Sequence, residues 1–444
     1  MTGKVGMVSL GCPKNQMDAE LMLAKIAKAG YEITPESGLA DVVIINTCGF
    51  IEDAKKEAIE NILEFAQLKK EKRIRGIIVT GCLAERYREE LVSELPECDA
   101  VLGLGANGDI VEAVETVLSG ERLVRFPDRS CWSLEGDRVL TTPSFFAYMR
   151  IADGCNHRCA YCAIPLIRGD LRSRPLEALV SEAKALAKSG VKELVLVAQD
   201  PTVYGQDLTG GSQLCTLLDA LCEIDGLRWI RLLYCYPDHL TDDILETVAR
   251  QEKVVPYLDV PIQHASGRVL RAMHRYGDAD TLRALFAHIR EKIPGVVLRT
   301  TVMTGFPGET EEDFEALCQL VADVKFERLG CFAFSPEEGT PAADMPDRVP
   351  DDVKERRRDI LMEQQAVIAA RYHEAQIGTV KEVLVESYDR YAERWFGRSA
   401  ADAPDIDGKV FFTCPSGRTV RPGEFIPVKI TDAMDWDLMG EWIG

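Results

Sequence analysis

Short apolar runs alternate with helical patterns along the first 125 residues. Each run has the length of a strand, and the segment after it places apolar residues at helical spacing. This alternation is typical of a parallel sheet covered by helices. The predicted strands are Val5–Leu10, Asp41–Asn46 and Gly76–Thr80, and the predicted helices are Asp18–Ala29, Ile51–Leu68 and Glu85–Leu95. We therefore expect an N-terminal α/β domain over residues 1–125.

A second β/α series follows a polar, irregular linker at about residues 126–143. Six strand-and-helix units predict an incomplete TIM barrel that is open on one side, and a long charged helix at about 351–375 ends it. The domain is expected over residues 141–375. Its predicted strands are Phe146–Ile151, Glu193–Ala198, Trp229–Tyr234, Tyr257–Val260, Val297–Thr301 and Arg328–Phe334.

The pattern changes again from Gly378 to short alternating strands separated by Gly and Pro turns. Such a pattern favours a small antiparallel β-barrel, which we place at residues 376–444. The predicted strands are Lys381–Glu386, Trp395–Arg398, Lys409–Thr413 and Phe425–Thr431. The whole chain is thus of the α/β class, with an all-β domain at its end.

Composition adds limits on location and partners. Hydrophobic residues make up 46% and charged residues 28% of the 444 positions, as in ordinary globular proteins. No apolar run approaches the roughly 18 residues of a membrane span, and Met1–Lys4 leads directly into a strand without signal-peptide features. We expect a cytoplasmic protein. The net charge of −20 argues against sequence-blind binding to phosphate backbones and fits either a basic protein partner or simple solubility.

Three of the fourteen cysteines fall within eight residues, at Cys155, Cys159 and Cys162. Thiols stay reduced in the cytoplasm, so clustered cysteines indicate metal binding or catalysis. Three thiolates in a tight loop suit an iron–sulfur cluster with one iron left open for a small molecule. A structural zinc site would require a fourth ligand. His157 is either that ligand or an ordinary loop residue.

Three single cysteines form a second pattern, because each follows a predicted strand. Cys12, Cys48 and Cys82 all stand at strand ends and precede a helix. Ligands collect at this edge of a parallel sheet, and neighbouring strands lie about 4.8 Å apart. The three thiols are therefore expected to converge on one cluster. The alternative is three unrelated buried cysteines.

The Cys155–Cys162 loop resembles the radical-SAM superfamily. With the N-terminal cysteines, the chain resembles the methylthiotransferases over nearly its whole length, including their C-terminal TRAM domain. The resemblance is carried by Ser9–Glu20 (SLGCPKNQMDAE), Cys155–Pro175 (CNHRCAYCAIPLIRGDLRSRP), Val260–His264 (VPIQH) and Arg299–Glu309 (RTTVMTGFPGE). Met17 and Ala19 stand where the family usually has Val and Ser.

The resemblance implies the cofactors and the reaction. It implies two [4Fe–4S] clusters and S-adenosylmethionine (SAM), of which one molecule supplies a radical and another a methyl group. The metal ligands are then Cys12, Cys48, Cys82, Cys155, Cys159 and Cys162. The open iron of the N-terminal cluster is thought to carry the sulfur that is inserted. No catalytic residue beyond these ligands is assigned.

Two branches of the family differ in substrate. One modifies an adenosine in tRNA; the RimO type modifies the β-carbon of an aspartate in the small-subunit ribosomal protein numbered twelve. Gly11–Asn15 (GCPKN) resembles the RimO type, where the tRNA branch typically shows GCQMN. Ile164–Leu171 (IPLIRGDL), Ser335–Thr340 (SPEEGT) and Gly397–Gly408 also resemble the RimO type. Methylthiolation of tRNA adenosine is the alternative.

Charge favours the same branch. From His373 to the end, thirteen Asp and Glu face eight Lys and Arg. A barrel that grips tRNA should be basic, whereas an acidic one suits a basic ribosomal protein. We expect Asp402, Asp405 and Asp407 to meet that partner, although a solvated acidic surface is the alternative. We also expect a monomer that does not bind tRNA and that receives electrons from a flavodoxin-like or similar donor.

Weaker signals mark four possible SAM contacts. Gln199 and Gln263 end predicted barrel strands. Gly305 lies in a strand-to-helix turn that either borders SAM or is simply a turn capped by Thr310. Arg299 either faces a carboxylate of the cofactor or makes a structural ion pair. The remaining cysteines show no ligand spacing and are treated as core or incidental residues: Cys98, Cys131, Cys215, Cys222, Cys235, Cys318, Cys331 and Cys414.

Overall fold

The structure is a computed structural model that describes residues 3–444, and its N-terminal part is a six-stranded parallel sheet. The strand order is β2-β1-β3-β4-β5-β6, and every neighbouring pair is parallel. Its strands are β1 (Lys4–Ser9), β2 (Glu32–Thr34), β3 (Val42–Thr47), β4 (Gly76–Gly81), β5 (Ala100–Leu102) and β6 (Leu123–Arg125). The covering helices are α1 (Pro13–Lys28), α2 (Glu52–Lys70), α3 (Cys82–Glu94) and α4 (Ile110–Ser119).

The predicted parallel sheet is confirmed, and its three long strands are β1, β3 and β4. All residues of β3 and β4 are buried, because helices cover both faces of the sheet. Strands β2, β5 and β6 were not predicted, because each has only three residues, too few for a recognisable pattern of apolar and polar positions. Helices α1 and α3 begin earlier than predicted, directly after Cys12 and at Cys82 itself.

The second sheet also has six parallel strands and stays open. Its order is β14-β13-β12-β11-β10-β7, as expected for a partial barrel. The strands are β7 (Phe146–Arg150), β10 (Glu193–Val197), β11 (Trp229–Leu232), β12 (Val254–Asp259), β13 (Val297–Thr304) and β14 (Arg328–Ala333). A two-stranded ribbon of β8 (Ala152–Asp153) and β9 (Arg172–Ser173) lies beside it.

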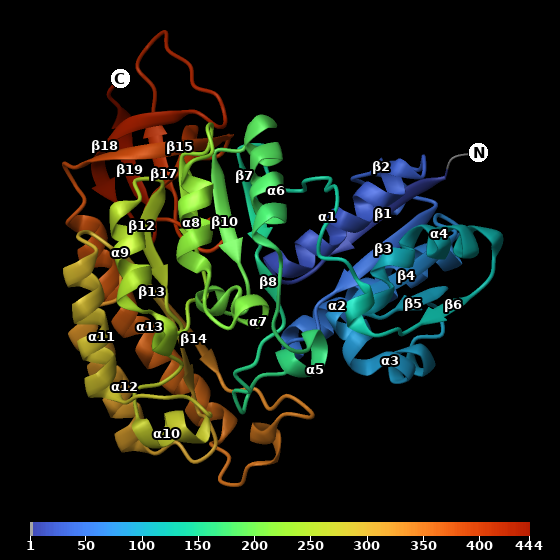
Figure 1. Ribbon diagram of the computed structural model, residues 1–444, viewed down its shortest axis with the longest axis horizontal. Coiled ribbons are helices and arrows are strands. Elements are labelled where there is room, and N and C mark those ends of the chain that lie inside the picture. The colour runs from blue at the N-terminus through green and yellow to red at the C-terminus, as the bar shows by residue number, and fades with distance from the viewer. Residues whose placement is uncertain (1–2) are drawn as a thin grey trace.

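Helices of this second part cover the outer face of the open sheet (Figure 1). They are α6 (Leu176–Lys188), α8 (Leu214–Cys222), α9 (Asp242–Arg250), α11 (Ala279–Lys292) and α12 (Glu311–Val324), while the short helices α7 (Gln206–Thr209) and α10 (Gly267–Ala272) lie toward the carboxyl ends of the strands. Short helix α5 (Ile164–Arg168) lies between this sheet and the N-terminal domain in Figure 1. The carboxyl ends of the parallel strands therefore face α5, at the end where active sites of such barrels lie.

Helix α13 (Asp351–Glu374) leads to a closed five-stranded barrel at the opposite end of the sheet (Figure 1). The barrel order is β15-β16-β17-β19-β18, with strands β15 (Val380–Asp389), β16 (Arg394–Ser399), β17 (Val410–Thr413), β18 (Phe425–Ala433) and β19 (Leu438–Trp442). The predicted barrel is confirmed, but it is mixed rather than purely antiparallel, because β17 and β19 run parallel. Strand β19, which closes the barrel, was not predicted.

The acidic stretch of this barrel does not form the expected free surface. Asp402 is 3% exposed and accepts a hydrogen bond from Arg328 Nη2 at 2.6 Å. Asp407 accepts one from the Tyr257 hydroxyl at 2.7 Å. Only Asp405 of the three is exposed. The prediction for Asp402 and Asp407 was wrong. Arg328 and Tyr257 of the open sheet donate hydrogen bonds to these carboxylates, which attaches the C-terminal barrel to the sheet.

The domain bounds 1–125, 141–375 and 376–444 stay predictions, and residues 1 and 2 of the first lie outside the described range. Within residues 3–444, no helix is both long and apolar enough to cross a membrane.

Candidate functional site

A cavity of about 330 Å³ lies where the N-terminal sheet meets the carboxyl end of the open sheet. All six predicted ligand cysteines line this central cavity. Its other lining residues are Lys14, Asn15, Phe50, His157, Tyr161, Ile164, Ile167, Arg168, Gln199, Tyr234, Cys235, Tyr236, Pro261, Gln263 and Arg275. Two cysteine triads that are far apart in the sequence thus share one chamber.

Cys12, Cys48 and Cys82, the N-terminal cysteine set, are brought together by the topology of the sheet. They follow β1, β3 and β4, which are direct neighbours. Gly11 has φ +87°, and a Cβ atom there would lie 2.7 Å from the Cβ of Cys48. Glycine is therefore required where the loop after β1 passes the loop after β3.

Asn15 ties these loops to each other. Its side-chain nitrogen, Nδ2, donates to the carbonyl oxygens of Leu10 at 2.7 Å and of Asn46 and Thr47 at 3.2 Å. The Asn46 side chain returns a hydrogen bond to the Asn15 carbonyl at 2.7 Å. The segments that carry Cys12 and Cys48 are thereby held at a fixed separation.

Cys155, Cys159 and Cys162, the loop cysteine set, are held by a single loop after β8. Gly154 has φ +75°, and a Cβ atom there would lie 2.0 Å from the carbonyl oxygen of Asp170. The Cys155 amide donates to the Gly169 carbonyl at 3.0 Å, which closes the loop against the end of α5. The Ala160 amide donates to Met273 at 3.0 Å.

Burial disfavours the thiolate form at four of the six cysteines while no metal is bound. Desolvation raises the pKa of Cys82 to about 12 and the pKa of Cys162 to about 12, and it raises the pKa values of Cys48 and Cys155 as well. Metal binding must therefore displace protons from these thiols. Both sets of three thiols face the same cavity. Each set matches the donors of an iron–sulfur cluster with one open iron.

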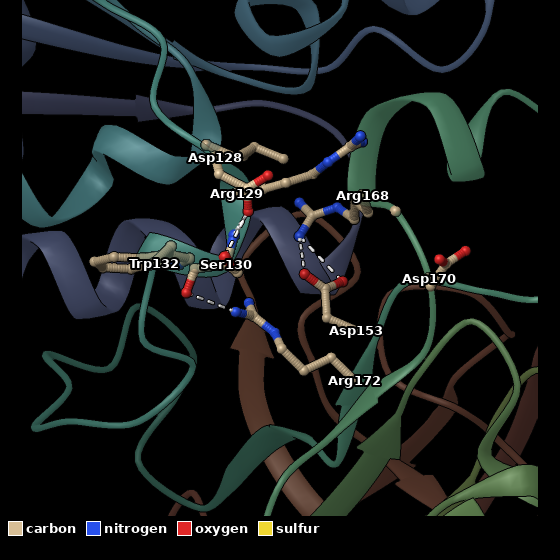
Figure 2. Close-up of a pocket in the computed structure, with 10 residues that line it drawn as sticks. Asp128, Arg129, Ser130, Trp132, Asp153, Arg168, Asp170 and Arg172 are labelled. Atoms are coloured by element: carbon tan, nitrogen blue, oxygen red, sulfur yellow. Dashed lines mark hydrogen bonds and ion pairs between the residues drawn. The ribbon is translucent and has the colours of Figure 1, made fainter. Parts of the chain in front are cut away.

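Arg168 stands beside the N-terminal cysteine set with both of its charge partners buried. Its Nη2 lies 3.5 Å from Cys82 Sγ and 3.0 Å from Asp18 Oδ2, and its Nη1 lies 3.1 Å from Asp153 Oδ2. Figure 2 shows Arg168 and Asp153 facing each other on the wall of a second pocket, with Trp132 and Arg172 nearby; Arg168 lines both this pocket and the central cavity. Asp18 and Asp153 thus compensate Arg168, and both also lie within ion-pair distance of Arg150.

A second interdomain contact lies beside Cys48. Arg86 of α3 donates to Glu337 Oε2 at 2.9 Å and, through its other nitrogen, to the Glu338 carbonyl at 2.8 Å. The same guanidinium donates to the carbonyl of Gly49 at 2.9 Å. The side chains of Arg86 and Glu337 are 5% and 4% exposed, so the pair forms a buried pin between the two domains.

His157 has partners other than the cysteines. Its Nε2 lies 2.7 Å from Asp200 Oδ2, and its ring stacks on Tyr236 with centroids 3.9 Å apart. His239 Nδ1 lies 3.2 Å from the same carboxylate oxygen. The ligand atoms of His157, Asp200 and His239 lie close enough to hold a metal ion, yet mutual hydrogen bonds already satisfy them. The group anchors the cysteine loop to the segments that follow β10 and β11.

Gln199 and Gln263 line the cavity as predicted strand-end residues. Gln199 donates to Asp153 Oδ1 at 3.0 Å. Gln263 has φ +69°, and neighbouring Tyr234 has φ +70°. Non-glycine residues in this region carry backbone strain, which concentrates at functional sites.

The structure does not bring Arg299 or Gly305 into the cavity. Arg299 donates to Asp259 Oδ1 at 2.8 Å and lines a different pocket, next to the C-terminal barrel. Gly305 donates its amide to Glu309, and a Cβ atom there would lie 2.1 Å from the Cβ of Lys354. A capping box of Thr310 and Asp313 follows. Both positions therefore match their structural alternatives, which are an ion pair for Arg299 and a capped strand-to-helix turn for Gly305.

Sequence reasoning gave no role to several lining residues. Cys235 lines the cavity although its spacing gave no signal. Lys14 and Asn15 lie in the quoted motif beside Cys12, where their position was a usable signal. Arg168 also lies in a quoted motif, whereas Arg275 gave no signal, because its cysteine partner is 116 residues away in the sequence.

Three family models match successive parts of the chain. The Uncharacterized protein family UPF0004 matches residues 4–103, the Radical SAM superfamily matches 149–321 and the TRAM domain matches 377–443.

Full-length relatives share nearly half of the sequence. The ribosomal protein uS12 methylthiotransferase RimO of Pelotomaculum thermopropionicum is 49% identical over 442 residues, covering 99% of both chains. That of Geobacter sulfurreducens is 46% identical over 443 residues, covering 99% of this chain and 98% of the relative.

Among solved structures, the radical S-adenosylmethionine methyltransferase TsrM of Kitasatospora setae has a TM-score of 0.55. It is 14% identical and covers 86% of this chain and 81% of its own, a likeness in fold alone.

Proposed function

The chain belongs to the RimO family of ribosomal protein uS12 methylthiotransferases, and on that premise we propose that it methylthiolates the β-carbon of an aspartate in uS12. The observation that carries this proposal is the placement of two cysteine triads around one cavity. A radical formed at one triad and a sulfur atom held at the other would both reach a substrate side chain there.

Family membership implies SAM and iron–sulfur clusters as cofactors. We propose two [4Fe–4S] clusters, one on the N-terminal cysteine set and one on the loop cysteine set. When bound, the cluster at the loop set supplies the electron that cleaves SAM to a 5′-deoxyadenosyl radical, and the other supplies the place for the transferred sulfur. Two SAM molecules would be consumed in each turnover.

The chain's own residues would hold and shield these groups. Phe50, Ile164 and Ile167 give the cavity apolar walls, which keep water away from a reactive intermediate. Gln199 and Gln263 offer amide groups at the strand ends for the polar parts of SAM. Lys14 is buried, with its pKa lowered by desolvation, and its Nζ donates to the Ala198 carbonyl at 3.1 Å.

The partner would be recognised partly by charge. The net charge of −20 suits a basic ribosomal protein better than tRNA. With the side chains of Asp402 and Asp407 each 4% exposed, Asp405 and other exposed carboxylates would have to provide the attraction. We further propose a monomer that accepts single electrons from a flavodoxin-like or similar donor.

Mass spectrometry of modified products tests the proposal. Anaerobically reconstituted protein would be given SAM, a reductant and either isolated uS12 or tRNA. A methylthio mass increment on a uS12 aspartate is expected, and none on tRNA adenosine. Cys48→Ala protein serves as the inactive control. Modification of tRNA with none on uS12 would instead assign the chain's activity to the tRNA branch.

A further inference from the structure

Arg275 is a buried cation at the loop cysteine set. It is 8% exposed and follows α10. Its Nη1 lies 3.9 Å from Cys159 Sγ and 3.4 Å from the Tyr161 hydroxyl, and its Nη2 donates to the Pro261 carbonyl at 2.6 Å. The guanidinium carbon lies 4.2 Å from the centroid of the Tyr236 ring.

The backbone around Arg275 is attached to the cysteine loop on both sides of Cys159. The Ala160 amide donates to the Met273 carbonyl at 3.0 Å, and His274 Nδ1 lies 3.1 Å from the Arg158 carbonyl oxygen. The Arg275 amide itself donates to Leu270 at 2.7 Å. The position of the guanidinium beside Cys159 is therefore built into the fold.

Arg275 differs from the other buried arginines in its charge balance. Seven more arginines within residues 3–444 are buried, and each forms an ion pair with Asp or Glu: Arg150, Arg168, Arg174, Arg231, Arg328, Arg357 and Arg398. Arg275 forms none with any carboxylate of that range; its partners are a carbonyl, a hydroxyl, an aromatic face and a thiol.

An uncompensated cation in a buried place requires an anion. Of the two side-chain atoms that Arg275 Nη1 contacts, the Cys159 sulfur is the one that becomes anionic when it binds an iron–sulfur cluster as a thiolate. Such a cluster gains one negative charge on reduction, so a nearby cation stabilises the reduced form more than the oxidised one. Charges and hydrogen bonds around the sulfurs set cluster potentials in general.

We propose that Arg275 is a positioning residue that raises the reduction potential of the cluster at Cys155, Cys159 and Cys162 through its cation beside the Cys159 sulfur. This inference rests on the proposed function, which places a cluster there. The step it favours is a one-electron reduction of the cluster by an external donor of the flavodoxin class. Low local dielectric strengthens the effect, because the side chain is shielded from water.

The test is a redox titration of the full-length chain followed by electron paramagnetic resonance, without SAM. The Cys12, Cys48 and Cys82 residues are replaced by Ala, so that only the loop cluster reports. Arg275→Gln should shift the midpoint potential to more negative values, whereas Arg275→Lys should keep most of the wild-type value. Arg271→Gln is the matched control, since this exposed arginine lies on α10, and it should leave the potential unchanged.

Each other outcome has a defined meaning. An unchanged potential in Arg275→Gln protein with full iron content would overturn the inference, as would a shift seen only after SAM is added. Loss of iron from both the Gln and the Lys variants would also overturn it, by assigning Arg275 to loop folding. If the background chain with intact Arg275 binds no cluster at the loop, the proposed function fails instead.

Discussion

The two cysteine sets reach the same cavity by different routes. The loop cysteine set lies within eight residues, so local spacing alone brings its thiols together. The N-terminal cysteine set spans residues 12–82, and its thiols meet because β1, β3 and β4 are neighbours in a parallel sheet. One site depends on the conformation of a loop, and the other depends on the folding of a whole domain.

The arginine beside each set differs as well. Arg168 lies 3.5 Å from Cys82 Sγ and is compensated by Asp18 and Asp153. Arg275 lies 3.9 Å from Cys159 Sγ and has no carboxylate partner within residues 3–444. The difference teaches that similar ligands can be given unlike electrostatic surroundings, as suits the different roles that we propose for the two sets.

Removal of the loop set should have the largest effect. Replacing Cys155, Cys159 and Cys162 by Ala should abolish reductive cleavage of SAM, because no cluster remains to deliver the electron. Iron content should fall from about eight to about four per chain, since the N-terminal set is built independently. Iron analysis and a 5′-deoxyadenosine assay measure both quantities.

A matched control replaces three cysteines outside the cavity, Cys98, Cys318 and Cys414, and should retain all the iron. Complete loss of iron from a folded loop-set variant would show that the two sets are not independent.

The opposite change sharpens the comparison. Cys48→Ala should leave SAM cleavage largely intact and abolish methylthio transfer, because the sulfur loses its place while the loop set is untouched. Parallel assays of 5′-deoxyadenosine and of modified uS12 separate the two activities. Normal methylthiolation by this variant would remove the role assigned to the N-terminal set.

The charge compensation of Arg168 can be broken directly. Asp18→Asn removes one of the two carboxylates that Arg150 and Arg168 share, and breaking such a buried pair costs about 3–5 kcal/mol of unfolding free energy. Denaturant unfolding of the metal-free protein measures the loss. Asp170→Asn is the control: its exposed pair with Arg158 should contribute at most about 1 kcal/mol. Equal losses would contradict the burial argument.

The smallest effects should come from the glycines beside the thiols. Gly11→Ala and Gly154→Ala each introduce a strained, crowded residue, which costs about 1–3 kcal/mol. Each should lower iron at its own set only. Gly30→Ala adds comparable strain in open space, so iron content should stay unchanged. If either Gly11→Ala or Gly154→Ala lowered the iron content at both sets, the two sets would be coupled.

Much of this arrangement could be predicted from the sequence. Hydrophobic periodicity indicated both parallel sheets, and the position of Cys12, Cys48 and Cys82 after predicted strands indicated that their thiols converge. What could not be predicted depends on distant pairing. Asp402 looked like a surface carboxylate because its partner Arg328 lies 74 residues away. Arg168 is compensated in part by Asp18, which lies 150 residues away in the N-terminal domain, whereas the partners of Arg275 lie within its own domain, up to 116 residues away. The parallel pairing of β17 with β19 required knowledge of how the barrel closes.

The Arg86–Glu337 pin has a consequence for how the molecule responds to heat. Domains joined by small polar contacts usually move and melt separately. Here, pulling the N-terminal domain away would separate two charged side chains that are 5% and 4% exposed, and it would also break the hydrogen bond from Arg86 to the Glu338 carbonyl. Because that separation is so unfavourable, the two domains should unfold in a single calorimetric transition, and the chamber between them should keep its width until the whole unit melts.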